Sequence, residues 1–327
     1  MAPPRTGSSQ SKTPPSPLKT LLVVNPKSQN GALGKSWPRL SKIVRRHLGS
    51  FEEAFTQGPQ DATRIAREAL RNGVDLVVAI GGDGTINEVA NGFFENGKAV
   101  AEHASMGILP FGTGGDFRKT VGLPKDIEKA SEILARFETK RIDLGRLDYT
   151  TREGGRGQHV FVNITSFGIS GEIDEEVNRA SKRLGGRLSF MLATAKVSFR
   201  FKAKRVRVVF DGNEDTSIET GISTVAVANG RFFGGGMQVA PHAEVDDGLF
   251  DVVAIGDMGL LESMWKGRRL YSGSHLTLEN VSERRASSVY AESLDGQDVL
   301  IDMDGEVPGM LPATLTLMPQ ALSLVVP

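Results

Sequence analysis

A glycine-rich stretch with one carboxylate is the part of the chain best suited to chemistry. Residues 81–85 read GGDGT, after an apolar run at 76–80 and before an amphipathic stretch at 86–94. This order predicts a buried strand, a tight turn and a helix. Glycines let a ligand approach the backbone, and the amides that begin a helix favour an anion. The stretch therefore predicts a phosphate-binding turn, although it matches neither the Gly-x-Gly-x-x-Gly pattern nor the P-loop.

Asp83 is the unusual residue in this turn. A carboxylate beside bound phosphates repels them unless it contacts a metal ion, a ribose or a hydrogen-bond donor. Glycines that only allow close packing are the alternative reading of the turn, and Asp83 makes that reading weaker.

A second group of carboxylates, Asp302, Asp304 and Glu306, alternates along the chain near its end. In a strand all three fall on one face, and their repulsion would raise one pKa toward the range of a general base. The alternative is a hairpin turn, because Asp-Gly at 304–305 is a common turn sequence.

A third candidate is the acidic loop at residues 244–249, EVDDGL. Adjacent carboxylates before a glycine, with exposed backbone carbonyls, suit a hard cation such as Mg²⁺, but they also suit a polar hairpin loop. His242 is the one histidine near any candidate site, and a lone histidine supports neither a Ser-His-Asp triad nor a zinc site.

The segment Lys182–Arg207 contains nine lysines and arginines and no acidic residue, mixed with apolar side chains such as Phe190, Leu192 and Phe199. Such a mixture fits docking to an anionic membrane surface. A helix that packs on the sheet and exposes its basic face to solvent explains the same pattern, so both readings stay open.

Composition narrows the class of protein. The 327 residues carry 39 basic and 39 acidic side chains. The net charge is therefore zero and does not indicate a nucleic-acid partner. The absence of cysteine excludes disulfides and thiolate metal sites and fits a reducing compartment. No apolar run approaches the roughly 20 residues that span a bilayer. Residues 1–17 are rich in Pro, Ser and Thr, and we expect a disordered tail there rather than a secretory signal.

The elements that position these groups divide the chain in two. Over residues 18–142, strands expected at 18–24, 51–56, 76–80 and 105–109 alternate with helices expected at 33–48, 62–72, 86–94 and 126–137. This alternation predicts a parallel α/β sheet, which brings the loops 25–31, 81–85 and 110–117 to one edge.

Over residues 143–327 the texture changes to short alternating runs separated by glycine-rich and acidic turns. These runs predict an antiparallel β-sandwich or barrel, with the last strand returning toward the first domain. Two helices interrupt it, expected at 174–198 and 258–272.

Together these motifs resemble the diacylglycerol kinase catalytic-domain family, which includes bacterial soluble lipid kinases and sphingosine and ceramide kinases. The resemblance runs from about residue 18 to the end of the chain and is most specific at GGDGTINE, residues 81–88. It implies an α/β nucleotide-binding domain similar to phosphofructokinases and NAD kinases, followed by a β-sandwich domain that binds the lipid. The implied activity is transfer of the γ-phosphate of ATP to a lipid hydroxyl, diacylglycerol or similar, in the interdomain cleft.

The resemblance also assigns residues. Glu306 is the expected proton acceptor, Asp304 is the second choice, and Asp83 engages Mg²⁺ or orients the nucleotide. One Mg²⁺ would travel with ATP, and a structural Mg²⁺ would bind Asp247 with the backbone oxygens of Glu244 and Leu249. The residues expected along ATP are Asn25, Pro26, Lys27, Ser28, Thr56, Gly81, Gly82, Asp83, Gly84, Thr85, Ile86, Asn87 and Thr113.

The implied setting is cytoplasmic and peripheral to a membrane, with no nucleic-acid partner; a homodimer is compatible with a sequence that fixes no oligomeric state. Gln29 and Gly115 depart from the family, which usually has glycine and asparagine there. The rival functions are an NAD or sugar kinase on the same fold and a non-catalytic lipid-binding regulator.

Overall fold

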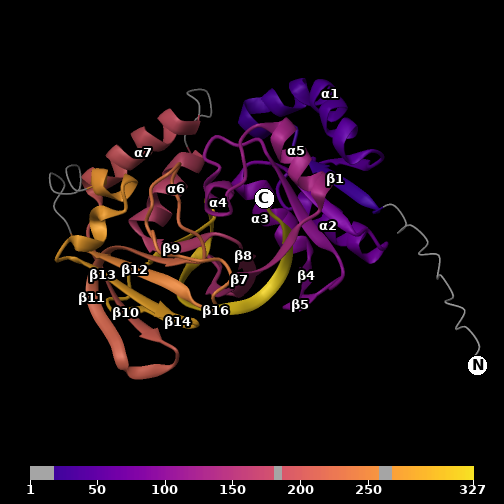
Figure 1. Ribbon diagram of the computed structural model, residues 1–327. Helices are drawn as coiled ribbons and strands as arrows, with labels where there is room; N and C mark the ends of the chain where they lie inside the picture. Colours follow the sequence, from indigo (N-terminus) through magenta and orange to yellow (C-terminus); the bar gives the residue numbers. More distant parts are fainter. Residues whose placement is uncertain (1–17, 180–185, 258–266) are drawn as a thin grey trace, which may run out of the picture.

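The computed structural model describes residues 18–179, 186–257 and 267–327, which form two lobes joined by a shared sheet (Figure 1). The expected tail at residues 1–17 lies outside the described residues. None of the helices that the described residues form is long and apolar enough to cross a membrane.

The first lobe is a three-layer α/β domain. Its parallel strands lie in the order β2-β1-β3-β6, with bounds Thr20–Val24 (β1), Glu52–Phe55 (β2), Leu76–Gly81 (β3) and Ser105–Pro110 (β6). Its helices are α1 (Ser28–Leu48), α2 (Asp61–Arg71), α3 (Asp83–Gly92), α4 (Asp116–Thr120) and α5 (Ile127–Arg136). Alternate strand residues face opposite layers: Leu21 and Val23 pack with α2 and α3, whereas Leu22 and Val24 pack with α1 and α5. The strand-end loops therefore meet at one edge, as the sequence predicts.

The second lobe is an antiparallel β-sandwich. Its strands are β7 (Thr139–Thr150), β8 (Arg156–Phe161), β9 (Ile164–Gly168), β10 (Lys204–Phe210), β11 (Asn213–Ala228), β12 (Phe250–Gly256), β13 (Val281–Ala286), β14 (Ser288–Ser293), β15 (Leu300–Met303) and β16 (Glu306–Val325). The pairings β11-β10-β14-β16-β15-β9-β11 close into a circuit. Phe161, Phe167 and Phe250 are fully buried in its core, so the strands surround one apolar interior.

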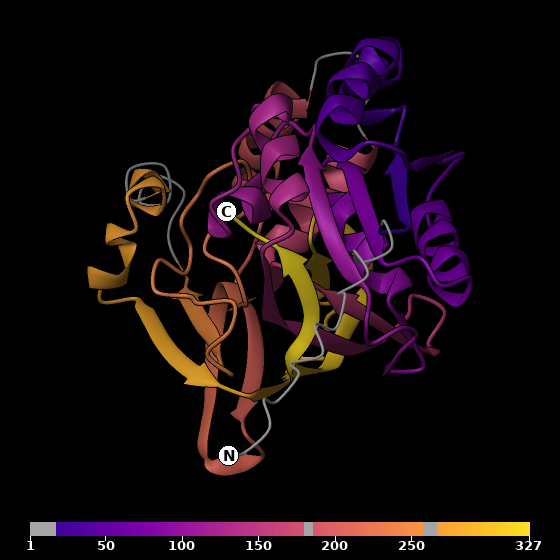
Figure 2. The same cartoon turned by 45° about the vertical axis from the view of Figure 1, so that its right-hand side comes forward.

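β16 joins the two lobes. It pairs antiparallel with β15, β14 and β7 and then runs parallel to β6, where Ser323 pairs with Ser105. Figure 2 shows this yellow strand passing from the second lobe into the first sheet. The hydroxyls of Ser105 and Ser323 lie 2.9 Å apart, which fixes the register at the junction.

Several elements differ from the sequence expectation. The single helix expected at 174–198 is two helices, α6 (Ile169–Arg179) and α7 (Gly186–Arg200), on either side of residues 180–185, which lie outside the described residues. Most of the helix expected at 258–272 also lies outside them, and the part described is a short 3₁₀ turn, η2 (Gly267–Tyr271), followed by η3 (Ser274–Thr277). Strands β7 and β13 and the short hairpin β4 (Phe94–Glu95) with β5 (Lys98–Ala99) were not expected.

Candidate active site

Three strand-end loops of the first domain bind one another. Asn25, after β1, donates its side-chain amide to Thr85 Oγ at 3.0 Å, and Gln29 donates its amide to the Gly112 carbonyl at 3.0 Å. The backbones at residues 82 and 112 touch, because a Cβ added to Gly112 would lie 2.6 Å from the Gly82 Cα. Glycine is therefore required at residue 112, and the three loops form one surface.

That surface encloses a cavity of about 210 Å³. The predicted residues in its wall are Gly81, Gly82, Asp83, Ile86 and Thr113. Pro110, Gly112, Gly114, Gly115, Arg118, Lys119, Lys125 and Gly235 complete the lining. The three cations were missed by sequence reasoning, which stopped at the glycine turn. They give the cavity the charge that an anionic group requires.

The other residues expected along ATP do not form the wall of this cavity. Lys27 reaches the Gln57 carbonyl at 2.8 Å, and the amide of the buried Thr56 pairs with the Val24 carbonyl. The remaining ones are Asn25, Pro26, Ser28, Gly84, Thr85 and Asn87, at the ends of β1 and β3.

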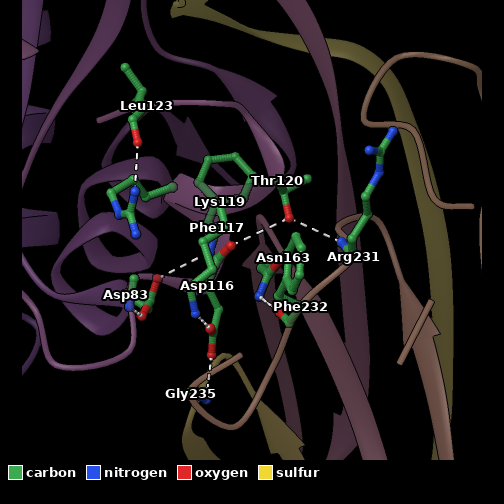
Figure 3. A network of polar contacts seen from close by, with 12 residues as sticks. Asp83, Asp116, Phe117, Lys119, Thr120, Leu123, Asn163, Arg231, Phe232 and Gly235 are labelled. Atoms are coloured by element: carbon green, nitrogen blue, oxygen red, sulfur yellow. Dashed lines mark hydrogen bonds and ion pairs between the residues drawn. The ribbon is translucent and has the colours of Figure 1, made fainter. Parts of the chain in front are cut away.

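Asp83 begins α3 and binds the loop in front of α4. Its carboxylate accepts the backbone N–H of Gly115 at 2.9 Å and that of Phe117 at 3.2 Å (Figure 3). Burial, and then the negative charge of Asp116, raise the pKa of Asp83. Of the partners that a carboxylate near phosphates requires, the structure supplies hydrogen-bond donors.

Asp116 connects the cavity to the second domain, a role that sequence reasoning missed. Its carboxylate accepts the Lys119 ammonium at 2.8 Å and the backbone N–H of Gly235 at 2.7 Å (Figure 3). Next to it, Thr120 Oγ accepts the N–H of Arg231 at 3.0 Å. In the sequence, the signal for this role was the position of Asp116 in the glycine-rich loop 112–116, next to Gly115.

The Asp304-Gly305 pair forms a two-residue hairpin turn between β15 and β16, with φ of 50° and 89°. The expectation that Asp302, Asp304 and Glu306 share one strand face is therefore wrong, because the chain reverses between them. The three carboxyl groups instead lie in three different surroundings, so the hairpin and a chemical role are compatible.

The Asp304 carboxylate is enclosed in backbone amides. It accepts the N–H of Val162 at 3.0 Å and of Ile164 at 2.9 Å. The Asn87 side-chain amide lies 3.2 Å away, and the orientation that satisfies both of its polar atoms turns its nitrogen toward Asp304. Burial raises the pKa of Asp304 to about 7, against the opposing effect of the two amides. Asp304 therefore joins the start of α3 to the second domain.

Glu306 faces the glycine turn. A Cβ added to Gly84 would lie 4.0 Å from its Oε1, so the carboxylate is adjacent to the first turn of α3. Burial, and then the charge of Glu88, raise the pKa of Glu306. Among the described residues no hydrogen bond engages this carboxylate, which leaves both of its oxygens free to accept a proton.

The acidic loop has its own partners. Asp247 pairs with the guanidinium of Arg285 and accepts the Leu249 N–H at 3.1 Å. The described residues contain no cluster of three or more metal-binding side chains. The nearby Asp251 Oδ2, on β12, is buried without a hydrogen-bond partner and lies 4.0 Å from Arg285 Nε, so Arg285 is the cation beside both Asp247 and Asp251. A Mg²⁺ at Asp247 and the carbonyls of Glu244 and Leu249 would compete with Arg285.

Comparison with known proteins agrees with this architecture. The diacylglycerol kinase catalytic domain matches residues 19–147, and the YegS C-terminal NAD kinase beta sandwich-like domain matches residues 163–326. A Bacillus subtilis protein named diacylglycerol kinase is 27% identical, over 88% of this chain and 92% of its own. A Xanthomonas euvesicatoria protein named "Probable lipid kinase YegS-like" is 31% identical, over 75% of this chain and 77% of its own.

Solved structures share the fold. A Bacillus anthracis diacylglycerol kinase matches with a TM-score of 0.66 and 21% identity, over 94% of this chain and 97% of that chain. The yeast NADH kinase matches with a TM-score of 0.51 and 10% identity, over 96% of this chain and 84% of that chain. The matched domains, their order and the relatives agree, and the chain belongs to the diacylglycerol kinase catalytic-domain family of lipid kinases.

Proposed function

We propose that this protein transfers the γ-phosphate of ATP to a hydroxyl group of a lipid. The observation that carries the proposal is the position of Glu306 beside Gly84, at the start of the helix whose turn lines a cavity with Arg118, Lys119 and Lys125. A cavity for phosphates and an unengaged carboxylate from the other domain are the two parts that a kinase reaction needs.

The cavity suits a polyphosphate. The first amides of α3 and the three cations supply donors and positive charge, while Gly81 and Gly82 leave the backbone open to the ligand. The adjoining loop at residues 25–28, with Thr56, would hold the rest of the nucleotide. Mg²⁺ bound with ATP would neutralise the phosphate oxygens, which is the chief electrostatic requirement of phosphoryl transfer.

Glu306 would act as the proton acceptor. The substrate hydroxyl oxygen forms a bond to the γ-phosphorus, the bond from that phosphorus to the bridging oxygen breaks, and ADP leaves. The hydroxyl proton passes to Glu306, whose raised pKa suits a general base. Asp304 is the weaker candidate because backbone amides already engage both of its oxygens.

We further propose that the lipid arrives from a membrane surface contacted by α7. Leu192 is 53% exposed and Phe199 is 80% exposed. They are seven residues apart and so lie on the same face of α7, with Lys196 between them. Lys196 and Arg200 both pair with Glu176, so two cations share one acidic partner. Exposed apolar side chains beside surplus basic charge fit an anionic membrane.

A structural Mg²⁺ at Asp247 is a separate proposal. Mg²⁺ without nucleotide should raise Tm relative to a sample containing chelator, and Asp247→Asn should remove that rise. An identical Tm in both samples would argue against this site and leave the kinase proposal unaffected.

The deciding experiment is transfer of radiolabelled γ-phosphate from ATP and Mg²⁺ to a panel of lipids in mixed micelles, with NAD and sugars as parallel acceptors. We expect label in one lipid class. Label only in NAD or a sugar would contradict the proposal that the acceptor is a lipid. A rise in Tm with ATP but no labelled product would favour a regulator that binds without catalysis.

A further inference from the structure

The three cations of the cavity wall differ in whether a carboxylate already holds them. Lys119 is paired with Asp116 at 2.8 Å, whereas no carboxylate among the described residues pairs with Arg118 or Lys125. Lys125 is exposed, while Arg118 is partly buried on α4. Within the described part of the chain, Arg118 makes one hydrogen bond, from Nη1 to the Leu123 carbonyl at 2.8 Å. A guanidinium has several further N–H donors, so Arg118 keeps most of its donors and its full charge for a ligand.

Gly115 is the residue that lets Arg118 take this position. It precedes α4 with a φ of 61° and is buried. A Cβ added there would lie 3.0 Å from Arg118 Nε and 3.8 Å from Nη2, so the guanidinium packs against the Gly115 backbone. The Leu123 carbonyl binds the same guanidinium. The group is therefore held in place before a ligand arrives, which reduces the entropy lost on binding.

Arg118 also decides the sign of the charge at the cavity. Asp83 is the one carboxylate in the described wall, and Asp116 lies beside it: a Cβ added to Gly114 would lie 3.2 Å from Asp83 Oδ2 and 3.4 Å from Asp116 Oδ2. In their ionised forms, these two carboxylates are balanced by the two lysines of the wall. Arg118 is the fifth charge, and it makes the group positive, as an anionic ligand requires.

We propose that Gly115 and Arg118 form one phosphate-binding unit, in which the missing side chain at residue 115 admits the Arg118 guanidinium to the cavity wall. The ligand class is a polyphosphate, because two cations without an acidic partner line one cavity and a guanidinium binds two phosphate oxygens at once. Lys119 serves the domain contact through Asp116, whereas Arg118 serves the ligand. This inference rests on the proposed function, since the polyphosphate is that of ATP, and it names the residue that sets the affinity.

The test is a double-mutant cycle on the affinities for ATP and for inorganic tripolyphosphate, both with Mg²⁺, measured from the ligand-dependent rise in Tm. Arg118→Ala should weaken the binding of both ligands about tenfold or more, because a charged hydrogen-bond partner is lost. Gly115→Asn should weaken it to a similar extent, since asparagine tolerates a φ of 61° but its side chain occupies the space of the guanidinium. The double variant should bind no more weakly than Arg118→Ala.

Two control variants make the same chemical changes away from the cavity. Gly73→Asn, at a φ of 76°, adds the same side chain where a Cβ meets no atom within 4 Å. Arg136→Ala removes an exposed arginine of α5 and so matches the change in net charge. Both should bind ATP and tripolyphosphate as wild type does. Arg118→Lys keeps the charge but not the planar fork, and we expect an intermediate loss of affinity.

Wild-type affinity in Arg118→Ala would overturn the inference. Additive losses in the double variant would also overturn it, because Gly115 and Arg118 would then act separately. A loss for ATP but not for tripolyphosphate would place the contact at the nucleoside and would count against a phosphate-binding unit. The Arg118 variants change no backbone conformation, so they decide the role of the guanidinium even if Gly115→Asn does not fold.

These binding measurements need no lipid, which separates the inference from the proposed function. If the expected losses appear but wild type phosphorylates no lipid, the proposed function fails and the phosphate-binding unit stands. If wild type phosphorylates a lipid and Arg118→Ala binds ATP normally, the inference fails alone.

Discussion

The carboxylate of Asp116 accepts the backbone N–H of Gly235 at 2.7 Å, and the contact joins the two domains beside the cation-lined cavity. The same carboxylate holds Lys119 at 2.8 Å, so one side chain sets both the domain contact and the position of a cavity cation. Nucleotide affinity and domain contact should therefore depend on each other.

Asp116→Ala should weaken ATP binding about tenfold, because a charged hydrogen-bond partner contributes about 1.5–3 kcal/mol. Titration of the ATP-dependent rise in Tm measures this change. Thr120→Val is the matched control, since it removes the neighbouring interdomain bond to Arg231 but no contact at Lys119. Equal ATP affinities in the two variants would argue against a role for Asp116 at the cavity.

Gln29 combines a favourable contact with an unfavourable backbone. It adopts a φ of 50°, a conformation that favours glycine, and donates to Gly112. Gln29→Gly should leave the free energy of unfolding within about 1 kcal/mol of wild type, because strain relief offsets the lost bond. Gln29→Ala keeps the strain and should destabilise by about 1 kcal/mol. Chemical denaturation measures both changes.

If the bond to Gly112 orders the nucleotide loops, both Gln29 variants should raise KM for ATP. Asn30→Gly, at a φ of 56°, is the control and should leave KM unchanged. A raised KM in Asn30→Gly alone would contradict this account of Gln29.

Gly112→Ala should separate the loops after β3 and β6, because its Cβ would lie 2.6 Å from the Gly82 Cα. We expect KM for ATP to rise at least about tenfold, with the backbone shift spread over both loops. Gly58→Ala, where an added Cβ meets no atom within 4 Å, serves as the control in the same kinetic assay. A normal KM for Gly112→Ala would show that ATP does not need the close approach.

Glu306→Gln should lower kcat by about 10²–10⁴-fold, the usual contribution of a general base, while the ATP-dependent rise in Tm is retained. Single-turnover transfer measures the chemical step directly. The parallel variant Asp304→Asn keeps an acceptor for one of its two backbone amides and should retain more activity than Glu306→Gln. The reverse order would move the base to Asp304.

The pKa of Asp304, raised to about 7, predicts a stability change in the neutral range. Because the folded state binds this proton more tightly than the unfolded state, the stabilisation is present at acidic pH and is lost as pH rises through about 7. Tm should therefore fall across this window in wild type and fall less in Asp304→Asn. A curve with the same slope in both proteins would locate the titration elsewhere.

The parallel domain and its strand-end loops follow from local sequence, because apolar runs, glycines and helical periodicity are short-range signals. The circuit of the second domain does not: the pairing of β9 with β11 and β15 joins residues far apart in the chain. The split between α6 and α7 coincides with a change from acidic residues in α6 to basic and apolar residues in α7, a signal that the sequence analysis did not use.

The candidate site shows the same division. The glycine turn and the Asp304–Glu306 region were found as motifs, but their contact across the domains depends on tertiary structure. Arg118, Lys119 and Lys125 read as ordinary basic residues until α4 brings the first two to the cavity.

The path of β16 has a consequence for how the protein is made. The described pairings give β6 two neighbours, β3 and the last residues of β16. During synthesis, ribosomes release residues 105–110 long before residues 323–324, so β6 presents an unpaired edge while the whole second lobe emerges. The nascent chain should therefore be most prone to aggregation or chaperone capture in this interval, and the first lobe completes its sheet only after the second lobe has been translated.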